Sequence, residues 1–377
     1  MGSYEPLASM EPFREVLRDP DAIARQWKAR GGKVVGCRCI FVPEEIIHAA
    51  GMLPYPLYGT AEPVRLADSY FQPCTCEFVR NLFDSAMGGR YSFLDGLVFA
   101  NTCDAIRRLW DMWEAYVDGA PSYMINNPQK LRSEVNRDYC LEELRRFRTW
   151  VELISGSPIT DEALGESIEL FDRTRGLLGE VASLRKQDPP LITGAEALEA
   201  GMAVTLMPRD RAGELLARLL EEAGSRKVEE AYGPRILVTG SILDDPALVR
   251  MIEEEGGLVV ADDLCTSAKA YRHLVGAEGD PMARLYEHLN RRPLCACMHP
   301  MEARFEYLDD LVREYDVEAL IDYNLKYCHP FLYEAPLLRK HFEALDVPVN
   351  VLEIGHDMSG HGQLRTRVQA FLEMLET

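Results

Sequence analysis

Cysteine is the residue type in this chain whose number and placement could do chemistry. The 377 residues include ten cysteines, and thiolates bind soft metals and iron–sulfur clusters. Six of them form three C-x-C pairs: Cys37/Cys39, Cys74/Cys76 and Cys295/Cys297. Structural zinc sites favour C-x-x-C, which is absent here, so a zinc ribbon is not indicated.

Three cysteines fall where a predicted strand or loop gives way to a helix. Cys103 follows the apolar run 96–100 and precedes an amphipathic run, Cys76 precedes "EFVRNLFDSA", and Cys328 follows "EALIDYN" after a short loop. Ligands of parallel α/β sheets bind at the carboxyl ends of strands. The wide spacing excludes a local ribbon and suits a cluster held between two domains. Spacing alone is equally compatible with three buried apolar cysteines.

The start of a helix favours cluster chemistry at these positions. Free N–H groups and the positive end of the helix dipole lower the pKa of a thiol and stabilise the thiolate. The same N–H groups can hydrogen-bond to cluster sulfurs and tune the potential. Three thiolates, instead of four, would leave one iron open to water or substrate.

The elements that must position these thiols follow an alternating pattern. Short β-rich runs alternate with helical stretches over 33–126 and again over 235–354, whereas 131 to about 225 is helical only, with Thr160 as the N-cap of one long helix. Pro43 is expected in a first helical turn. Alternation of this kind predicts parallel sheets covered on both faces.

The predicted fold class is therefore α/β, with two small doubly wound parallel-sheet domains joined by a helical segment and a cluster in the cleft between them. We expect an N-terminal helical segment over 1–30, a first α/β domain over 31–130, a helical connector over 131–230 and a second α/β domain over 231–377.

Composition limits the partners of the chain. The formal net charge of −20 opposes general binding to nucleic acid or to an anionic membrane. No apolar run of about 18 residues and no N-terminal signal pattern is present. We therefore expect a cytoplasmic protein with no nucleic-acid and no membrane partner, whose thiols are free.

Several stretches resemble subunits of the benzoyl-CoA reductase and 2-hydroxyacyl-CoA dehydratase family. The resemblance covers nearly the whole chain in order. It rests on "ARQWKARGGKVVGCRCIFVPEEIIHAAGMLP", "CEFVR", "GLVFANTCDAIRRLWDMW", "RILVTGSILDDP", "GGLVVADDLC", "GDPM", "LKYCHPFLYEAPLL" and "GQLRTRVQAFLEML". The first stretch and the length are most similar to the smaller, cluster-bearing subunit of the ATP-dependent reductase.

The resemblance implies a [4Fe-4S] cluster whose cysteine ligands fall on Cys76, Cys103 and Cys328. Cys76 is preferred over Cys74 because it stands four residues before Arg80, as in the family's C-x-x-x-R motif. Where relatives usually have Cys-Asp-Pro, this chain has a histidine at position 329, so a role for that acid does not carry over.

The resemblance also implies a mechanism and partners. An ATP-dependent activator protein would deliver single low-potential electrons, and the cluster would pass one to an acyl-CoA substrate to give a ketyl-type radical anion. The chain itself has no G-x-x-x-x-G-K-[ST] and no G-x-G-x-x-G motif, which agrees with ATP binding on the activator. A homologous second subunit would complete a heterodimer under anaerobic conditions.

The expected function is the [4Fe-4S] subunit of an aromatic acyl-CoA reductase acting on a benzoyl-CoA-like substrate. Three alternatives stay open: a subunit of an (R)-2-hydroxyacyl-CoA dehydratase, a homodimeric double-cubane cluster reductase of small molecules, and a non-catalytic paralogue. The sequence names neither the acyl group nor the substrate-binding subunit, and it identifies no catalytic proton donor.

The other cysteines have plainer interpretations. Cys39 is expected to pack in the core. Cys265 could line the cleft, but a packing role is favoured. Cys295 and Cys297 are expected on one face of a buried strand, because side chains at i and i+2 share a face.

Several further side chains are weighed as site residues. Arg107 and Arg108 are expected to be solvated charges more than ligand contacts, and His48 a hydrogen-bonded core histidine. Proton relay by His299, His329 or Glu334 is considered without being favoured. Trp110 and Trp113 are expected to pack in the core or at an interface.

Overall fold

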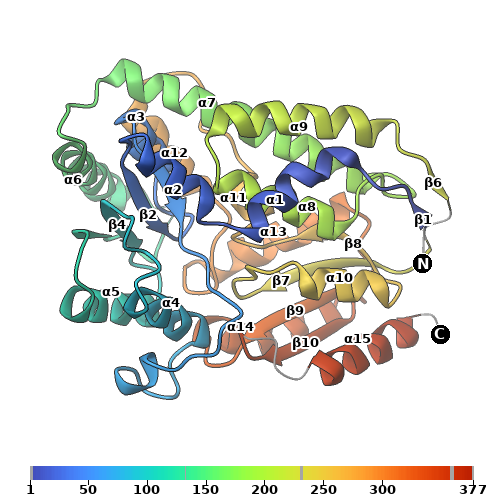
Figure 1. Ribbon diagram of the computed structural model, residues 1–377. Coiled ribbons are helices and arrows are strands. Elements are labelled where there is room, and N and C mark those ends of the chain that lie inside the picture. The colour runs from blue at the N-terminus through green and yellow to red at the C-terminus, as the bar shows by residue number, and fades with distance from the viewer. Residues whose placement is uncertain (1–2, 132, 230–231, 357–360, 376–377) are drawn as a thin grey trace.

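The computed structural model describes residues 3–131, 133–229, 232–356 and 361–375. Two four-stranded parallel sheets lie side by side, with long helices crossing both (Figure 1). The α/β class with two parallel sheets predicted from the alternating pattern is confirmed. In the described part of the chain, no helix has the length and apolar character that a bilayer span requires.

The first sheet has the strand order β3-β2-β4-β5. Its strands are β2 (Val34–Arg38), β3 (Leu53–Pro56), β4 (Gly96–Ala100) and β5 (Ser122–Ile125). The helices between these strands are α3 (Glu44–Ala49), α4 (Glu77–Met87) and α5 (Asp104–Tyr116). Pro43 is the N-cap of α3 and not a residue of its first turn. Its fixed φ suits this position too, because the N-cap lies just outside the helix.

The second sheet has the order β10-β9-β7-β8. Its strands are β7 (Arg235–Gly240), β8 (Leu258–Asp262), β9 (Ala319–Leu325) and β10 (Val349–Ile354). The helices of this half are α10 (Ala247–Glu254), α11 (Ala268–Tyr271), α12 (Pro281–Arg291), α13 (Met301–Glu314), α14 (His329–Glu343) and α15 (His361–Leu375). In both sheets the first strand lies between the second and the third, so the two halves share one topology.

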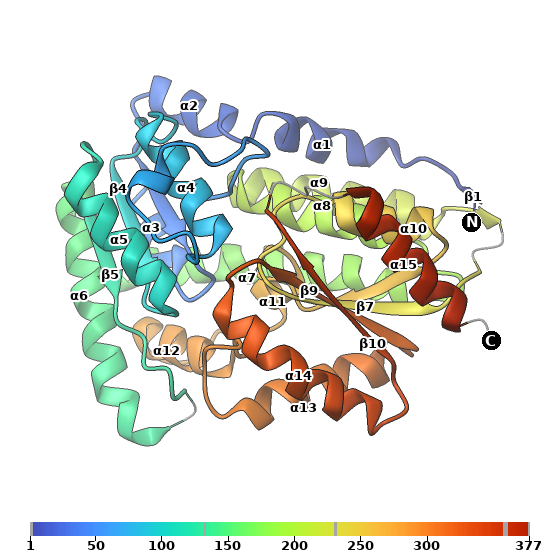
Figure 2. The same ribbon diagram turned by 90° about the horizontal axis from the view of Figure 1, so that it is seen from below.

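Four helices join the halves. They are α6 (Arg137–Ser155), α7 (Asp161–Ser183), α8 (Gly194–Thr205) and α9 (Arg209–Gly224), and α7 and α9 run across the molecule in Figure 2. Thr160 Oγ1 accepts the backbone N–H of Ala163, so the predicted N-cap of α7 is confirmed. Thr193 and Glu196 form a full capping box on α8, which satisfies two N–H groups that the helix leaves free.

The N-terminal segment lies along these helices. It contains β1 (Ser3–Tyr4), α1 (Glu11–Arg18) and α2 (Ala22–Ala29). Strand β1 pairs antiparallel with β6 (Val228–Glu229), which follows α9. Helix α1 then leads from the side of the second sheet toward the first (Figure 1).

Alternate strand residues point into different cores. Val34, Leu97 and Phe99 of the first sheet pack with α4 and α5 in a core that continues to α8, α10 and the second sheet. On the opposite face Val35 and Val98 pack with α6, α7 and α12. The other face of the second sheet packs against α13 and α14. The sheets thus share a continuous core, and α12, from the second half of the chain, packs on the first sheet.

Candidate functional site

Both sheets have a topological switch point, where successive strands are added on opposite sides. It lies between β2 and β4 in the first sheet and between β7 and β9 in the second. Ligands of open α/β sheets bind outside the carboxyl ends of the strands at such points. Cys39 follows β2 and Cys103 follows β4, while Ser241 follows β7 and Cys328 follows β9. Three thiols and a hydroxyl therefore come from the two crevices where a ligand is expected.

The three cysteines singled out from the sequence occupy equivalent positions on different helices. Cys76, Cys103 and Cys328 are the N-cap residues of α4, α5 and α14, and we call them the N-cap cysteines. Their helices belong to different halves of the chain. The predicted position of each thiol at the start of a helix is confirmed.

The N-cap cysteines interact with one another. Interaction with the Cys328 thiol lowers the pKa of Cys76 against the effect of burial, and the Val79 backbone N–H lowers that pKa further. The pKa of Cys328 is raised well above its ordinary value, first by Cys76 and then by burial. Burial raises the pKa of Cys103 to about 12, although the Ile106 backbone N–H opposes this. The fold thus gathers three desolvated thiols, and a positively charged centre would be needed to hold all three as thiolates.

The backbone beside two of the cysteines is strained. Cys39 has φ 100°, and Tyr327, directly before Cys328, has φ 64°. Residues other than glycine rarely adopt such angles, and they persist at functional sites where the surroundings fix them. Ser241 helps to fix the second turn, because its Oγ accepts the Leu325 backbone N–H at 3.1 Å.

Four more cysteines approach this region from loops. Cys39 follows β2, Cys265 follows β8, and both Cys295 and Cys297 lie between α12 and α13. We call these four residues the loop cysteines. The expectation that Cys295 and Cys297 lie on a buried strand is wrong, because residues 292–298 form a loop with a turn. Cys39 packs against the core of the first sheet, as expected.

Electrostatic effects connect the loop cysteines. The pKa of Cys295 is lowered to about 6, first by interaction with Cys297 and also, against burial, by the Lys269 ammonium. Burial raises the pKa of Cys265 to about 12, with Cys295 and Cys39 adding to the rise. The charge of Cys295 also contributes to the raised pKa values of Cys103 and Cys328. Cys295 therefore lies within electrostatic range of both groups.

A buried network of charges holds the loop that carries Cys295 and Cys297. Arg304 of α13 is 1% exposed and donates to Asp263 Oδ2 and Glu334 Oε1, each at 2.6 Å. Its Nη1 also donates to the Leu294 carbonyl oxygen at 3.2 Å, directly before Cys295. Lys269 Nζ lies 3.0 Å from Asp263 Oδ1, and both side chains are fully buried. Glu334 is thus an ion-pair partner of Arg304.

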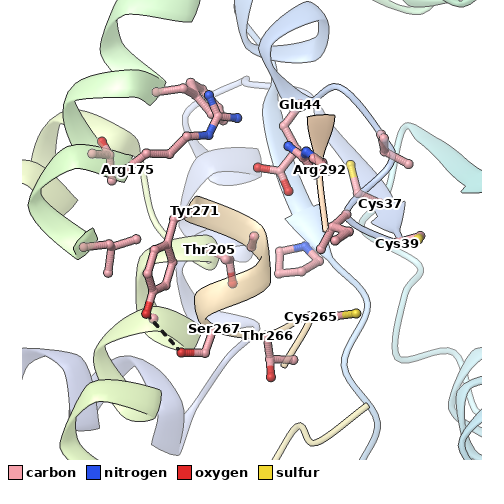
Figure 3. Close-up of a pocket in the computed structure, with 18 of the residues that line it drawn as sticks. Cys37, Cys39, Glu44, Arg175, Thr205, Cys265, Thr266, Ser267, Tyr271 and Arg292 are labelled. Carbon is pink, nitrogen blue, oxygen red and sulfur yellow. Dashed lines mark hydrogen bonds between the residues drawn. The ribbon is translucent and has the colours of Figure 1, made fainter. Parts of the chain in front are cut away.

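A central pocket lies between the two sheets (Figure 3). Its wall includes Cys37, Cys39 and Cys265 on one side, with Tyr271 and Ser267 opposite. Packing was the favoured interpretation of Cys265, but the structure places this residue in the wall of the pocket, which is the alternative. The pocket leaves about 80 Å³ for the centres of water-sized molecules, which is room for several waters or a ligand of a few heavy atoms.

The other side chains considered in the sequence analysis form ordinary structural contacts or are exposed to solvent. Arg107 and Arg108 are exposed and pair with acids on their own helix, as expected. His48 Nδ1 lies 2.9 Å from Ser167 Oγ, which confirms a hydrogen-bonded histidine. His299 and His329 are exposed.

The two tryptophans of α5 pack as expected. Trp113 is buried and contacts Tyr91 and Phe99. Trp110 packs against the same core and donates from Nε1 to Ser122 Oγ at 2.5 Å. Neither ring lines the central pocket.

Within the residues that the structure describes, no three Cys, His, Asp or Glu side chains lie close enough to bind one metal ion. This does not conflict with a cubane, because its three cysteine ligands bind three different irons and so lie further apart than the ligands of one ion.

Comparison with known proteins shows similarity along nearly the whole chain. Residues 39–375 match the family model described as 2-hydroxyglutaryl-CoA dehydratase, D-component. The (R)-phenyllactyl-CoA dehydratase beta subunit of Clostridium sporogenes is 27% identical over 364 residues, which cover 96% of this chain and 97% of that protein. One of the benzoyl-CoA reductase subunits of Thauera aromatica is 28% identical, with 94% of each chain covered.

A third relative is the (R)-2-hydroxyglutaryl-CoA dehydratase beta subunit of Acidaminococcus fermentans, which is 25% identical with 98% of this chain and 99% of that protein covered. The matched range includes the second sheet, the first sheet except β2, all three N-cap cysteines and all four loop cysteines. The chain therefore belongs to the 2-hydroxyglutaryl-CoA dehydratase D-component family and is an enzyme subunit of the dehydratase or reductase kind.

Proposed function

We propose that this chain is an iron–sulfur subunit that holds one [4Fe-4S] cluster on Cys76, Cys103 and Cys328 and serves the reduction or dehydration of an acyl-CoA thioester. The observation that carries the proposal is the convergence of three thiols, one buried and two half-buried, each at the N-cap of a different helix. The names of its relatives, which include both CoA dehydratase and benzoyl-CoA reductase subunits, support this substrate class.

The donor set suits such a cluster. Thiolates are the ligands that iron–sulfur clusters require, and three of them leave one iron without a protein ligand. In the absence of metal, burial disfavours the thiolate of Cys103, and interaction with Cys76 together with burial disfavours that of Cys328. Bound iron would supply the missing positive charge. When bound, the cluster would accept and pass on single electrons at a low potential.

The chain's own residues would orient and protect that centre. The first-turn N–H groups of α4 and α5 lie close enough to lower the pKa of their N-cap thiols, although neither thiol makes a capping hydrogen bond. These N–H groups would stabilise negative charge on the sulfurs. The surrounding core, in which Cys76 is only 6% exposed, excludes water from one side of the site.

The proposal includes partners. The relatives are named as subunits, so we propose a homologous second subunit, with an ATP-driven activator as the electron donor. Helix α14 begins directly after its N-cap residue Cys328. It carries Tyr333 and Leu337, which are 76% and 45% exposed. Such apolar side chains beside the proposed cluster would suit an interface.

Iron and sulfide analysis after anaerobic purification of the native complex tests the proposal. About four irons and four labile sulfides per chain are expected for one cubane. Cys103→Ser should lose most of this iron, whereas Cys140→Ser, whose thiol lies on α6 away from both cysteine groups, should keep it. Full iron and sulfide in the Cys103 variant would disprove this ligand set.

A second candidate function is supported by the loop cysteines. Cys265 and Cys295 lie within electrostatic range of the buried Lys269 ammonium, and Cys295 is also in range of Cys103 and Cys328. These additional thiols could hold a second cubane, and the candidate is then a double-cubane cluster enzyme that reduces a small molecule without CoA. This candidate predicts an iron content twice that of a single cubane, and Cys295→Ser should lose half of that iron. Unchanged iron in that variant, at four per chain in the wild type, would exclude this candidate.

A further inference from the structure

The central pocket is strongly basic in an otherwise acidic protein. Four arginines line it, Arg38, Arg175, Arg209 and Arg292, against one carboxylate, Glu44. The chain as a whole has a formal net charge of −20. A cluster of cations in this setting requires either paired acids or an anionic ligand, because buried charges are costly when they are not compensated.

Two of the four arginines are compensated within the protein. Arg175 pairs with Glu45 and, at 2.9 Å, with Asp172. Arg209 pairs with Glu44 and donates to the Val204 carbonyl oxygen at 2.7 Å. These pairs hold the guanidinium groups in the wall of the pocket.

Arg292 is not compensated in this way. Its side chain is 5% exposed, and its Nε donates to His288 Nε2 at 3.0 Å. No carboxylate of the described residues lies within ion-pair distance of its guanidinium group. Arg292 also follows the last residue of α12 and faces the pocket near Glu44 in Figure 3.

Arg38 is the second cation without an acidic partner among the described residues. Its guanidinium carbon lies 4.4 Å from the centre of the Phe78 ring, which holds the side chain from one side. Its buried Nε has no hydrogen-bond partner in the described part of the chain. Arg38 stands directly before the strained Cys39.

We infer that the central pocket is a binding site for a small oxyanion, with Arg292 and Arg38 as its counter-charges and with Cys39 and Cys265 beside the bound anion. Guanidinium groups offer paired donors that match carboxylate and phosphate oxygens. The volume open to the centres of water-sized molecules, about 80 Å³, is enough for an anion of a few heavy atoms. The inference is independent of the cluster proposal.

The test is calorimetric titration of the complete protein, purified anaerobically with whatever metal and subunits it carries. Acetate and inorganic phosphate are the probes, and acetamide, which has nearly the shape of acetate but no charge, is the control ligand. We expect at least one of the two anions to bind and acetamide to bind more weakly. Equal binding of acetate, phosphate and acetamide would overturn the inference.

Matched variants locate the site. Arg292→Met should weaken anion binding by at least about tenfold, because hydrogen bonds to charged groups contribute that much. Arg291→Met, which changes the exposed last residue of α12 directly before Arg292, should leave binding unchanged. Wild-type affinity in folded Arg292→Met would overturn the assignment.

A second variant is needed if circular dichroism shows that Arg292→Met does not fold. Arg38→Met should then weaken the same anions, and wild-type affinity in that variant would overturn the inference. Iron content measured on each sample separates the two proposals, since anion binding should be weakened in the arginine variants while iron is retained.

Discussion

Glu77 Oε2 accepts a 2.8 Å hydrogen bond from the backbone N–H of His356, and this contact joins the start of α4 to the segment after β10. Glu77 directly follows Cys76. His356 Nε2 lies 3.1 Å from Asp244 Oδ1, and the other oxygen of Asp244 accepts the Gly59 N–H at 2.7 Å. Loops from both sheets are thus tied together beside the N-cap cysteines.

This relationship predicts a loss of stability in Glu77→Ala. The variant leaves the His356 N–H without its acceptor and removes a negative charge from the first turn of α4, so the free energy of unfolding should fall by about 1–3 kcal/mol. Urea unfolding of the metal-free protein measures it. Glu62→Ala, at an exposed position, should change it by less than about 0.5 kcal/mol. Equal values for the two variants would show that the Glu77 contact contributes nothing.

Iron binding should distinguish the two cysteines of one C-x-C pair. Cys76→Ser should lose most of its iron, because a hydroxyl is a poor substitute for a thiolate. Cys74→Ser should keep it, since Cys74 is exposed and lies outside α4. Iron and sulfide analysis of both anaerobically purified variants decides the matter. Loss of iron from the Cys74 variant alone would reverse the assignment within the pair.

The buried ion network predicts a strong effect of Arg304→Met. Without the guanidinium group, Asp263 and Glu334 would both lose a buried counter-charge, and the free energy of unfolding should fall by about 3–5 kcal/mol. Arg313→Met on the same helix removes an exposed pair with Asp310 and should cost no more than about 1 kcal/mol. Denaturant unfolding of both variants provides the comparison, and similar losses would contradict a special role for the network.

The burial of His288 leads us to expect that the folded protein becomes less stable in acid. Burial lowers the pKa of His288 well below its ordinary value of 6.5, with the Arg292 charge adding to the effect. The folded protein keeps this ring neutral while the unfolded chain takes up a proton below pH 6.5. The contribution of His288 to the free energy of unfolding is therefore fully present above pH 6.5. It is lost as the pH falls, by up to about 1.4 kcal/mol for each pH unit.

His288→Gln checks this prediction, because glutamine keeps an acceptor for Arg292 but does not titrate. Unfolding free energies measured between pH 7.5 and 5 should fall less steeply in this variant than in the wild type. His299→Gln, at an exposed position, should retain the wild-type slope. An identical slope in all three proteins would mean that His288 does not stay neutral in the folded state.

Local patterns in the sequence were sufficient for the fold class and for the N-cap cysteines. Strands such as β2 and β4 are apolar on both faces, and this pattern with intervening helices requires a parallel sheet covered on both sides. The carboxyl end of a strand and the start of the next helix are close in sequence. The positions of Cys76 and Cys103 at helix starts could therefore be predicted from the residues next to them.

Only the tertiary structure decided where the loop cysteines and the pocket arginines lie. Residues 292–298 carry a strand-like apolar pattern, yet Arg304 from the next helix holds this segment as a loop by binding the Leu294 carbonyl oxygen. Likewise, nothing next to Arg292 in the sequence indicates burial, because its surroundings come from α3, α7 and β2. Contacts between residues far apart in the chain set these environments, and local periodicity carries no information about them.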